Sequence, residues 1–342
     1  FFLIDCSIQF IIVELLIMWA FIAVFALSQL TVGVALKCKC HVKLDEPLFS
    51  RVVNPLPHTY LKEDDLPSVW DWRNVNGTNY CSHVLTQQNP QVCGSCWAEA
   101  ATGALSDRYA IATGNRLRVQ LAPQNLLNFK QNITGGACTG GNSLKAYRFM
   151  HEYGISDDTC APFSGSNWQH GFTVADMYEV EEVQNHMCFL CKWDGNCVFV
   201  PREFYNLYGV DEYGSVSGVH EIKAEIYARG PVSCGLNSEP NEFNYYHGGI
   251  IRCENPNDPQ CAIKESDHVI VIAGWGRDKE TGEEYWIGRN SYGSQWGEGA
   301  GGGWFRLKLG SNVLGLESVG CTWGTPAAAD VSRAIKQFED SL

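Results

Sequence analysis

Hydrophobic and polar positions alternate with different periods in the two halves of this chain. After Ser95, the run from Cys96 to Ala112 is rich in helix-forming residues, and apolar side chains recur at Trp97, Ala101 and Leu105. Such spacing is typical of a helix with one apolar face, and serine is a favourable residue at the N-cap. The pattern therefore predicts a helix that begins at Cys96. Two further helices are expected near residues 122–129 and 143–153.

Beyond Phe199 the apolar residues come in short runs separated by Gly, Asn and Pro, which is typical of antiparallel strands. The predicted strands cover residues 205–210, 232–236, 269–273, 285–289 and 304–309. One helix, residues 217–229, lies among them. Residues 157–197, which precede this half, are expected to be loop-like and rich in cysteine. The chain is thus expected to adopt an α+β fold with a helical lobe (about 66–199) and a β-rich lobe (about 200–325).

The two ends of the chain are expected to lie outside the domain formed by residues 66–325. Residues 15–36 carry no charge and are long enough to cross a bilayer. Starting instead at Met18, the same stretch is typical of a cleaved signal peptide, which is the interpretation we favour for residues 1–36. Residues 37–65 are expected to form a pro-segment, and residues 326–342 a loosely attached C-terminal tail.

Charge and cysteine content narrow the function classes. The chain has 342 residues and a net charge of −13, which argues against nucleic acids and anionic membranes as partners. A membrane becomes a partner only if the N-terminal apolar segment is retained. The 15 cysteines indicate an oxidising compartment and a disulfide framework. Their odd number leaves at least one thiol outside any intramolecular disulfide.

Three residues at the ends of predicted elements suggest covalent catalysis by a cysteine. Cys96 lies in the first turn of a helix, where the macrodipole favours a thiolate. His268 begins a strongly apolar strand, and Asn290 follows the next strand. A thiolate nucleophile, an imidazole that exchanges protons and an amide that orients the imidazole are the groups a cysteine peptidase needs. A single histidine on an apolar strand would more often be a packed core residue.

Other motifs have competing interpretations. Cys93-Gly-Ser-Cys96 has the C-x-x-C spacing of redox proteins, and Cys188, Cys191, Cys197 and His186 have a zinc-like spacing. We favour disulfides for the second group because the chain is rich in cysteine. Residues 297–302 match G-x-G-x-x-G, but a predicted strand follows where a nucleotide site needs a helix. Asn76 and Asn132 begin N-x-T sequences that permit N-glycosylation.

Several of these motifs together resemble the papain family of cysteine peptidases, and within it the cathepsin X branch. They are Cys93-Gly-Ser-Cys-Trp97, Asp267-His268 with Ala273-Gly-Trp-Gly276, and Arg289-Asn-Ser-Tyr-Gly293 with Trp296-Gly-Glu298. The stretches 66–75, 211–218 and 224–234 also resemble that branch, and the similarity extends over about residues 57–325. The resemblance implies a two-lobe fold, with a helical lobe and an antiparallel barrel-like lobe on either side of a cleft. No metal or organic cofactor is implied.

The resemblance also assigns roles. Cys96 would be the nucleophile, His268 the general acid and base, and Asn290 the orienting amide shielded from water by Trp296. Gln87 would complete the oxyanion hole together with the Cys96 backbone N–H, although Gln87, Gln88 and Gln91 could each be a surface glutamine. Gly140 and Gly141 would offer their backbone to an extended substrate, since a missing side chain allows close approach.

A short loop before Cys93 bears on specificity. In cathepsin X this loop blocks the primed side of the cleft and presents a histidine to the substrate's C-terminal carboxylate. Here residues 87–90 keep its length, but Gln88 stands at the histidine position, beside Asn89. A neutral amide lacks the charge assistance of an imidazolium. We therefore expect a carboxypeptidase with a weaker preference for a free C-terminus or a different pH profile. An endopeptidase, or a catalytically silent binding protein marked by Gln88 and Tyr292, remains the alternative.

The resemblance implies a disulfide pattern and a cellular context. The implied pairs are Cys93–Cys138, Cys160–Cys188, Cys191–Cys197 and Cys234–Cys321. Cys253 and Cys261 could form a local bridge, Cys81 has no obvious partner, and Cys38 or Cys40 could cap the nucleophile in the proform. The expected partners are peptide or protein substrates and the chain's own pro-segment, which would act as an inhibitor. The protein is expected to be a monomer. The expected location is the secretory pathway, with a lysosome-like acidic vacuole or the extracellular space as its end.

Overall fold

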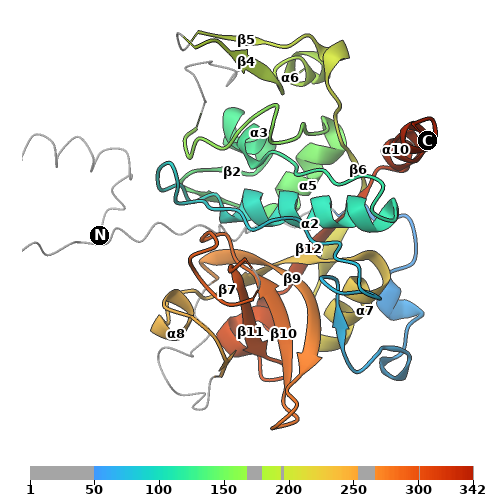
Figure 1. Cartoon of the computed structure of the whole chain (residues 1–342), viewed down its shortest axis with the longest axis vertical. Helices are drawn as coiled ribbons and strands as arrows, with labels where there is room; N and C mark the ends of the chain where they lie inside the picture. The colour runs from blue at the N-terminus through green and yellow to red at the C-terminus, as the bar shows by residue number, and fades with distance from the viewer. Residues whose placement is uncertain (1–49, 168–178, 194–195, 253–265, 300, 342) are drawn as a thin grey trace, which may run out of the picture. The chain divides into compact units, whose positions relative to one another are not determined.

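The computed structural model describes residues 50–167, 179–193, 196–252, 266–299 and 301–341 (Figure 1). They all belong to one compact unit spanning residues 40–342. The expected signal peptide or membrane span (1–36), the beginning of the expected pro-segment, and Cys38, Cys40, Cys253 and Cys261 lie outside the described residues. Within the described ranges, no helix combines the length and apolar character that a bilayer crossing needs.

Helices form most of the first lobe and flank the sheet of the second. The α-helices are α2 (Cys96–Ala112), α3 (Pro123–Asn128), α4 (Gln131–Thr134), α5 (Ser143–Glu152), α6 (Val180–Gln184), α7 (Val219–Arg229), α8 (Asn241–Asn244), α9 (Leu316–Val319) and α10 (Ala328–Glu339). Short 3-10 turns occur at Pro57–Thr59, Glu63–Asp65, Arg202–Phe204 and Val313–Gly315. Local chemistry explains several ends: the Asn142 side chain caps α5 by accepting from the N–H groups of Leu144 and Lys145.

Strands of the second lobe form one mixed sheet. They are β6 (Val210–Val216), β7 (Val232–Leu236), β8 (Ile250–Ile251), β9 (His268–Arg277), β10 (Glu284–Arg289), β11 (Trp304–Lys308) and β12 (Cys321–Pro326). Their order is β6-β12-β7-β9-β10-β11-β8, with β1 (Trp70–Asp71) paired to β9. All neighbours are antiparallel except β11 and β8. The first lobe contains the short pairs β2 (Gly136–Ala137) with β3 (Gly140–Gly141) and β4 (Phe189–Cys191) with β5 (Cys197–Phe199). The α+β class is confirmed, with an open sheet in place of a closed barrel.

Strand β9 separates two hydrophobic cores. Val269 and Val271 belong to the core of the helical lobe, whereas Ile270 and Ile272 belong to the core of the sheet lobe. Side chains alternate between the two faces of a strand, so an uninterrupted apolar run is what a strand covered on both faces requires. The apolar run that begins at His268 therefore serves both lobes, and it holds His268 at the boundary between them.

Helix α2 is buried on nearly every side, from Cys96 to Ala110. Small residues make this possible: a Cβ atom at Gly103 would lie 3.0 Å from a guanidinium nitrogen of Arg289 and 3.9 Å from a methyl carbon of Val271. The helix consequently packs against both lobes, and Figure 1 shows it between α5 and the strands of the sheet. The predicted single apolar face underestimates this burial.

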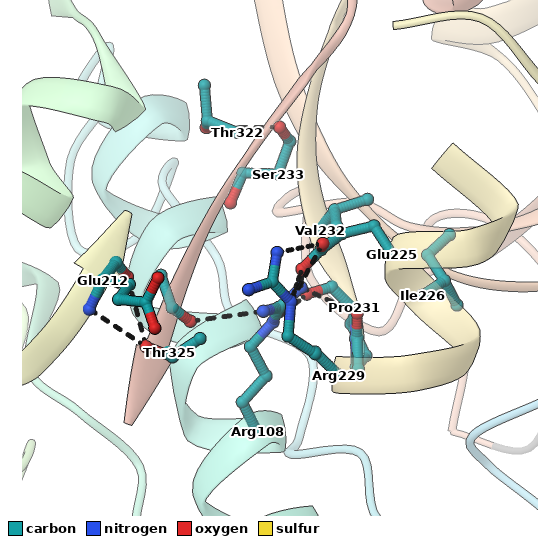
Figure 2. A network of polar contacts seen from close by, with 12 residues as sticks. Arg108, Glu212, Glu225, Ile226, Arg229, Pro231, Val232, Ser233, Thr322 and Thr325 are labelled. Carbon is teal, nitrogen blue, oxygen red and sulfur yellow. Dashed lines mark hydrogen bonds and ion pairs between the residues drawn. The ribbon is translucent and has the colours of Figure 1, made fainter. Parts of the chain in front are cut away.

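A buried ion-pair network fixes α2 to the sheet lobe (Figure 2). The Arg108 guanidinium donates to Glu225 Oε1 of α7 at 2.9 Å and to the Pro231 carbonyl at 2.7 Å, and the side chains of Arg108 and Glu225 are both fully buried. Burial lowers the pKa of Arg108, and Glu225 opposes that shift. Arg229 pairs with the same carboxylate and lies over the ring of Trp323. The network joins elements that are far apart in the sequence.

Two sequence predictions were wrong. Residues 205–210 form no strand before β6 begins at Val210, because Tyr205, Leu207 and Tyr208 pack as irregular chain against the helical core. Residues 326–342 are no loose tail, since α10 forms there. Asp330 of α10 accepts from the Tyr109 hydroxyl (3.1 Å) and the Gly209 N–H (2.8 Å). Residues 157–197 also contain regular structure, namely α6 and part of the β4–β5 hairpin.

Candidate active site

Helix α2 places Cys96 at its first residue, as predicted. Ser95 is the N-cap, but its hydroxyl contacts Glu99 Oε1 at 3.3 Å and caps no backbone N–H. Cys96 is fully buried and belongs to none of the disulfides. The dipole of a 17-residue helix favours negative charge at this position. The local structure therefore suits a thiolate.

The loop before Cys96 is held in place by Cys138. Cys93 is bonded to Cys138, and the Gly94 N–H donates to the Cys138 carbonyl at 2.7 Å. A Cβ at Gly94 would lie 2.6 Å from that carbonyl oxygen, so only glycine fits. Because Cys93 pairs with Cys138, the C-x-x-C sequence is not a redox disulfide with Cys96. The redox interpretation of this motif is wrong.

His268 and Asn290 form the hydrogen bond that their predicted roles require. His268 Nε2 lies 2.7 Å from Asn290 Oδ1, and both side chains are buried. The Ser291 N–H donates to the same Asn290 oxygen at 2.8 Å, which identifies that end of the amide as the acceptor. Nε2 of His268 must then carry a hydrogen, and Nδ1 is the nitrogen that can exchange a proton with a thiol.

The packing of α2 on β9 brings Cys96 and His268 to the same end of the two elements. Gly103 lies beside Val271, and Arg108, further along α2, bonds to Pro231, next to the residue that pairs with Ile272. The helix and the strand therefore run in the same direction. Cys96 precedes Gly103 by roughly 10 Å of helix, and His268 precedes Val271 by roughly 10 Å of strand. Cys96 and His268, the candidate nucleophile and base, thus lie at about the same height along the parallel axes of α2 and β9.

A second buried ion pair fixes the end of β10, next to Asn290. Arg289 Nη2 lies 2.9 Å from Asp107 Oδ2 on α2, and Arg289 also donates to the Ser82 carbonyl at 3.0 Å. Asp107 in turn accepts from the Ser82 N–H and hydroxyl. Sequence analysis missed these positioning residues, although a charged residue directly before Asn290 in an apolar strand was a usable signal.

Gln87 is buried and held at both ends of its amide. Its Nε2 donates to the Cys93 carbonyl at 3.0 Å, and its Oε1 accepts from the Ser291 hydroxyl at 2.7 Å. Gln88 and Gln91, by contrast, are exposed. The surface-glutamine interpretation is therefore excluded for Gln87 alone. Its amide lies between the Cys96 loop and the Asn290 segment, which is where an oxyanion donor belongs.

Two aromatic rings that the sequence did not assign to this role approach His268. The Tyr292 ring lies against the His268 ring, with centroids 5.0 Å apart, and Phe243 approaches the imidazole at 6.0 Å. Trp296 contacts Tyr292 and Phe243 instead, and its indole N–H donates to the carbonyls of Phe243 and Asn244. Trp296 thus packs against both rings that approach His268, and its shielding of the His268–Asn290 bond stays a prediction. Tyr292, which the sequence marked only as a departure from the family, has the nearer role.

The other predicted site residues are placed as follows. Gln88 and Asn89 are exposed at the surface. Gly140 and Gly141 form β3 and are buried, and a Cβ at Gly141 would lie 2.5 Å from the Trp97 ring. Close packing therefore explains Gly141, and a substrate contact stays a prediction. Asn76 and Asn132 are both exposed, which suits glycosylation.

The described part of the chain contains the four disulfides that the resemblance implies. The zinc interpretation of Cys188, Cys191 and Cys197 fails because all three are in disulfides, while His186 bonds to the Glu182 carbonyl. Cys81 is buried and belongs to no disulfide. Burial raises the pKa of the Cys81 thiol well above its usual value, so it is a poor nucleophile.

Glu99 is a buried carboxyl that sequence analysis did not single out. It lies one turn after Cys96 and lines a small hollow together with Val269 and Asn290. Burial raises its pKa from 4.5 to about 8, and the contact with Ser95 opposes the shift only partly. The group is therefore neutral in acid and becomes charged only near or above neutral pH.

The chain is similar in sequence to known cysteine proteases. The sequence pattern of the papain family of cysteine proteases matches residues 66–323. The chain belongs to this family. Cathepsin Z of Onchocerca volvulus is 39% identical over 274 residues, which cover 78% of this chain and 79% of that protein. The gut-specific cysteine proteinase of Caenorhabditis elegans is 28% identical over 255 residues, covering 74% of this chain and 72% of its own length.

Solved structures of papain-family members show the same fold. Digestive procathepsin L 3 from the larval midgut of Tenebrio molitor superimposes with a TM-score of 0.56 at 23% identity, covering 76% of this chain and 70% of its own. The proform of the ragweed pollen cysteine protease Amb a 11 gives 0.57 at 22% identity, covering 78% and 67%. The predicted two-lobe papain fold is confirmed.

Proposed function

We propose that this papain-family peptidase is a carboxypeptidase that releases C-terminal residues from peptides. The observation that carries the proposal is the position of the loop at residues 87–90. Thr86 pairs with Tyr292, and the Gln87 N–H donates to the Ser291 carbonyl at 2.9 Å. Because Tyr292 covers His268, the loop lies beside the catalytic histidine. A loop at this position limits the number of substrate residues that can follow the scissile bond.

The geometry supports a two-step acyl transfer. The Cys96 thiolate attacks the substrate carbonyl, and the oxyanion accepts hydrogen bonds from the Cys96 N–H and the Gln87 amide. The imidazolium of His268 then gives its proton to the leaving amine as the C–N bond breaks. In the second step His268 takes a proton from water, and the resulting hydroxide displaces the thiolate from the acyl-enzyme. Asn290 keeps the imidazole in the required tautomer throughout.

The test compares one peptide with a free C-terminal carboxylate and the same peptide with a C-terminal amide. The full chain is activated under mild reduction near pH 5, and N-terminal sequencing establishes which form is assayed. We expect sequential release of C-terminal residues from the free acid, at a kcat/KM at least tenfold above that for the amide. Cys96→Ala is the control for contaminating peptidases and should release nothing.

Two outcomes would contradict the carboxypeptidase. Equal cleavage of both peptides at internal bonds would make the chain an endopeptidase of the same family. No cleavage by the wild type, with the pro-segment removed, would favour a silent binding protein.

Gln88→His should strengthen the preference for a free C-terminus. An imidazolium adds charge assistance that an amide lacks, and such hydrogen bonds are about twice as strong as neutral ones. We expect the KM for the free acid to fall by about fivefold at pH 5 with little change for the amide. Gln91→His, another exposed glutamine of the same segment, is the matched control. An unchanged KM in Gln88→His would mean that residue 88 does not face the substrate's C-terminus.

We also propose that the chain is made as a zymogen in the secretory pathway and works as a monomer in a lysosome-like or extracellular space. The four disulfides support passage through an oxidising compartment. The raised pKa of Glu99 suits an acidic destination, where the buried carboxyl is neutral.

A further inference from the structure

A hollow beside the catalytic histidine is lined by hydrogen-bonding side chains and by no carboxylate. Tyr292 and Trp296 are its aromatic lining. Its polar lining consists of Gln88, Asn244, Tyr245, His247 and Gln295. The chain as a whole has a net charge of −13 and therefore repels anions. The amides, phenols and imidazole of this hollow can instead donate hydrogen bonds to an anion, and they carry no negative charge.

The hollow lies on the leaving-group side of the scissile bond. Tyr292 contributes one ring to it and stacks on His268 with centroids 5.0 Å apart. Gln88 belongs to the loop that pairs with Tyr292 through Thr86. The amine that leaves as the acyl-enzyme forms takes its proton from His268, so the departing part of the substrate extends from the histidine into this hollow.

His247 is held at the hollow by contacts on both sides of it in the sequence. The Trp296 indole N–H donates to the Asn244 carbonyl at 3.0 Å, and the Gly297 N–H donates to the carbonyl of the buried Tyr246 at 3.1 Å. The Tyr246 hydroxyl in turn donates to the Gly249 carbonyl. The backbone on either side of His247 is thereby fixed to the segment that carries Trp296, while the imidazole itself is exposed.

Charge singles out His247 among the lining residues. Of the described residues that line the hollow, it alone can become a cation, since the others are amides, phenols and an indole. The carboxylate bonded to this loop is Glu298, which accepts from the Gly249 N–H at 3.3 Å. Arg306 already neutralises it, with Nε 2.6 Å from Glu298 Oε1. An imidazolium at residue 247 therefore faces the hollow as an available positive charge.

We propose that His247 is a specificity residue that binds the carboxylate of the departing part of the substrate, supplying the charge that Gln88 lacks. The proposal rests on the carboxypeptidase function for the identity of that group as the C-terminal carboxylate. Gln88, Asn244 and Gln295 would add neutral donors around the same anion. A carboxylate side chain of the departing residue would satisfy the same chemistry, so the experiment separates the two sources.

The experiment measures kcat and KM at pH 5, where histidine side chains are normally protonated. One peptide pair differs only in a free-acid or amide C-terminus. A second pair, both amidated, carries Glu or Gln as the departing residue. The variants are His247→Gln, His247→Lys and His83→Gln. His83 is an exposed histidine at a different hollow, lined also by Tyr80 and Arg118, and its replacement matches the change in charge.

We expect His247→Gln to reduce the free-acid preference about tenfold, equivalent to about 1.4 kcal/mol, mainly through a higher KM for the free acid. His247→Lys should retain most of the preference, and His83→Gln should keep the wild-type value. A free-acid preference that survives in His247→Gln overturns the role of His247 and leaves the carboxypeptidase intact. A loss confined to the Glu-over-Gln preference overturns the assignment to the C-terminus. A wild type without any free-acid preference overturns the carboxypeptidase itself.

Discussion

Arg108→Met is expected to lower the free energy of unfolding by about 3–5 kcal/mol, the usual cost of removing one partner from a buried ion pair. Figure 2 shows the guanidinium between Glu225 of α7 and the backbone around Pro231. Arg108 also donates to the Gly230 carbonyl at 2.9 Å. Methionine fills part of the space but leaves these carbonyls and one side of the Glu225 carboxylate without donors, all of them away from water.

The measurement is urea unfolding followed by tryptophan fluorescence, with the disulfides intact. All proteins carry Cys96→Ala so that self-digestion does not distort the curves. Arg148→Met is the matched control: Arg148 pairs with Glu152 one turn away on α5, where both side chains are exposed. Its loss should cost less than about 0.5 kcal/mol. A cost below 1 kcal/mol for Arg108→Met would show that Arg229 alone can satisfy Glu225.

The candidate catalytic residues could be predicted from the sequence because each one lies at the end of an element with a strong local pattern. Cys96 starts a run of helix formers, and His268 starts an apolar strand. Helix α2 packs directly on β9 through small and β-branched side chains, so the first residues of both elements come to the same side of the fold. Asn290 follows the strand that pairs with β9.

The sequence could not predict the buried ion pairs between residues that are far apart along the chain. Asp107 and Arg289 are 182 positions apart, and Arg108 and Glu225 are 117 apart. Charged residues in a helix or strand are usually solvated, so periodicity alone assigns them to the surface. In the first pair only Arg289, a charged residue inside an apolar strand, is a usable local signal, and the second pair leaves none. The same holds for Tyr292, whose contact with His268 depends on how residues 290–293 leave β10.

Local patterns also misled where tertiary contacts replaced backbone pairing. Residues 205–210 have the apolar composition of a strand, yet Tyr208 makes only an isolated bridge to Ile155. Helix α10 has no buried residue, although its sequence is amphipathic. It is held instead by Asp330 and by Val331, which packs against the helical core.

Glu99→Gln is expected to make the protein more stable at neutral pH and to remove much of its pH dependence. In the unfolded chain a glutamate titrates near 4.5, whereas burial raises the pKa of Glu99 in the folded protein to about 8. Below pH 4.5 both states hold the proton and the free energy of unfolding is unaffected. Between 4.5 and 8 only the folded state keeps it, so stability falls as pH rises, by up to about 1.4 kcal/mol per pH unit.

The free energy of unfolding of the wild type should therefore fall by about 4 kcal/mol between pH 4 and pH 7.5 because of Glu99 alone. Glutamine keeps the shape and the contact with Ser95 but never ionises, so Glu99→Gln should exceed the wild type by about 3–4 kcal/mol at pH 7.5 and match it within about 1 kcal/mol at pH 4. Urea unfolding in the Cys96→Ala background at both pH values measures this, with Glu152→Gln, an exposed carboxylate, as the control. Parallel pH profiles for wild type and Glu99→Gln would refute the assignment. With this carboxyl one turn after Cys96, the protein is expected to be more stable in acid than at neutral pH.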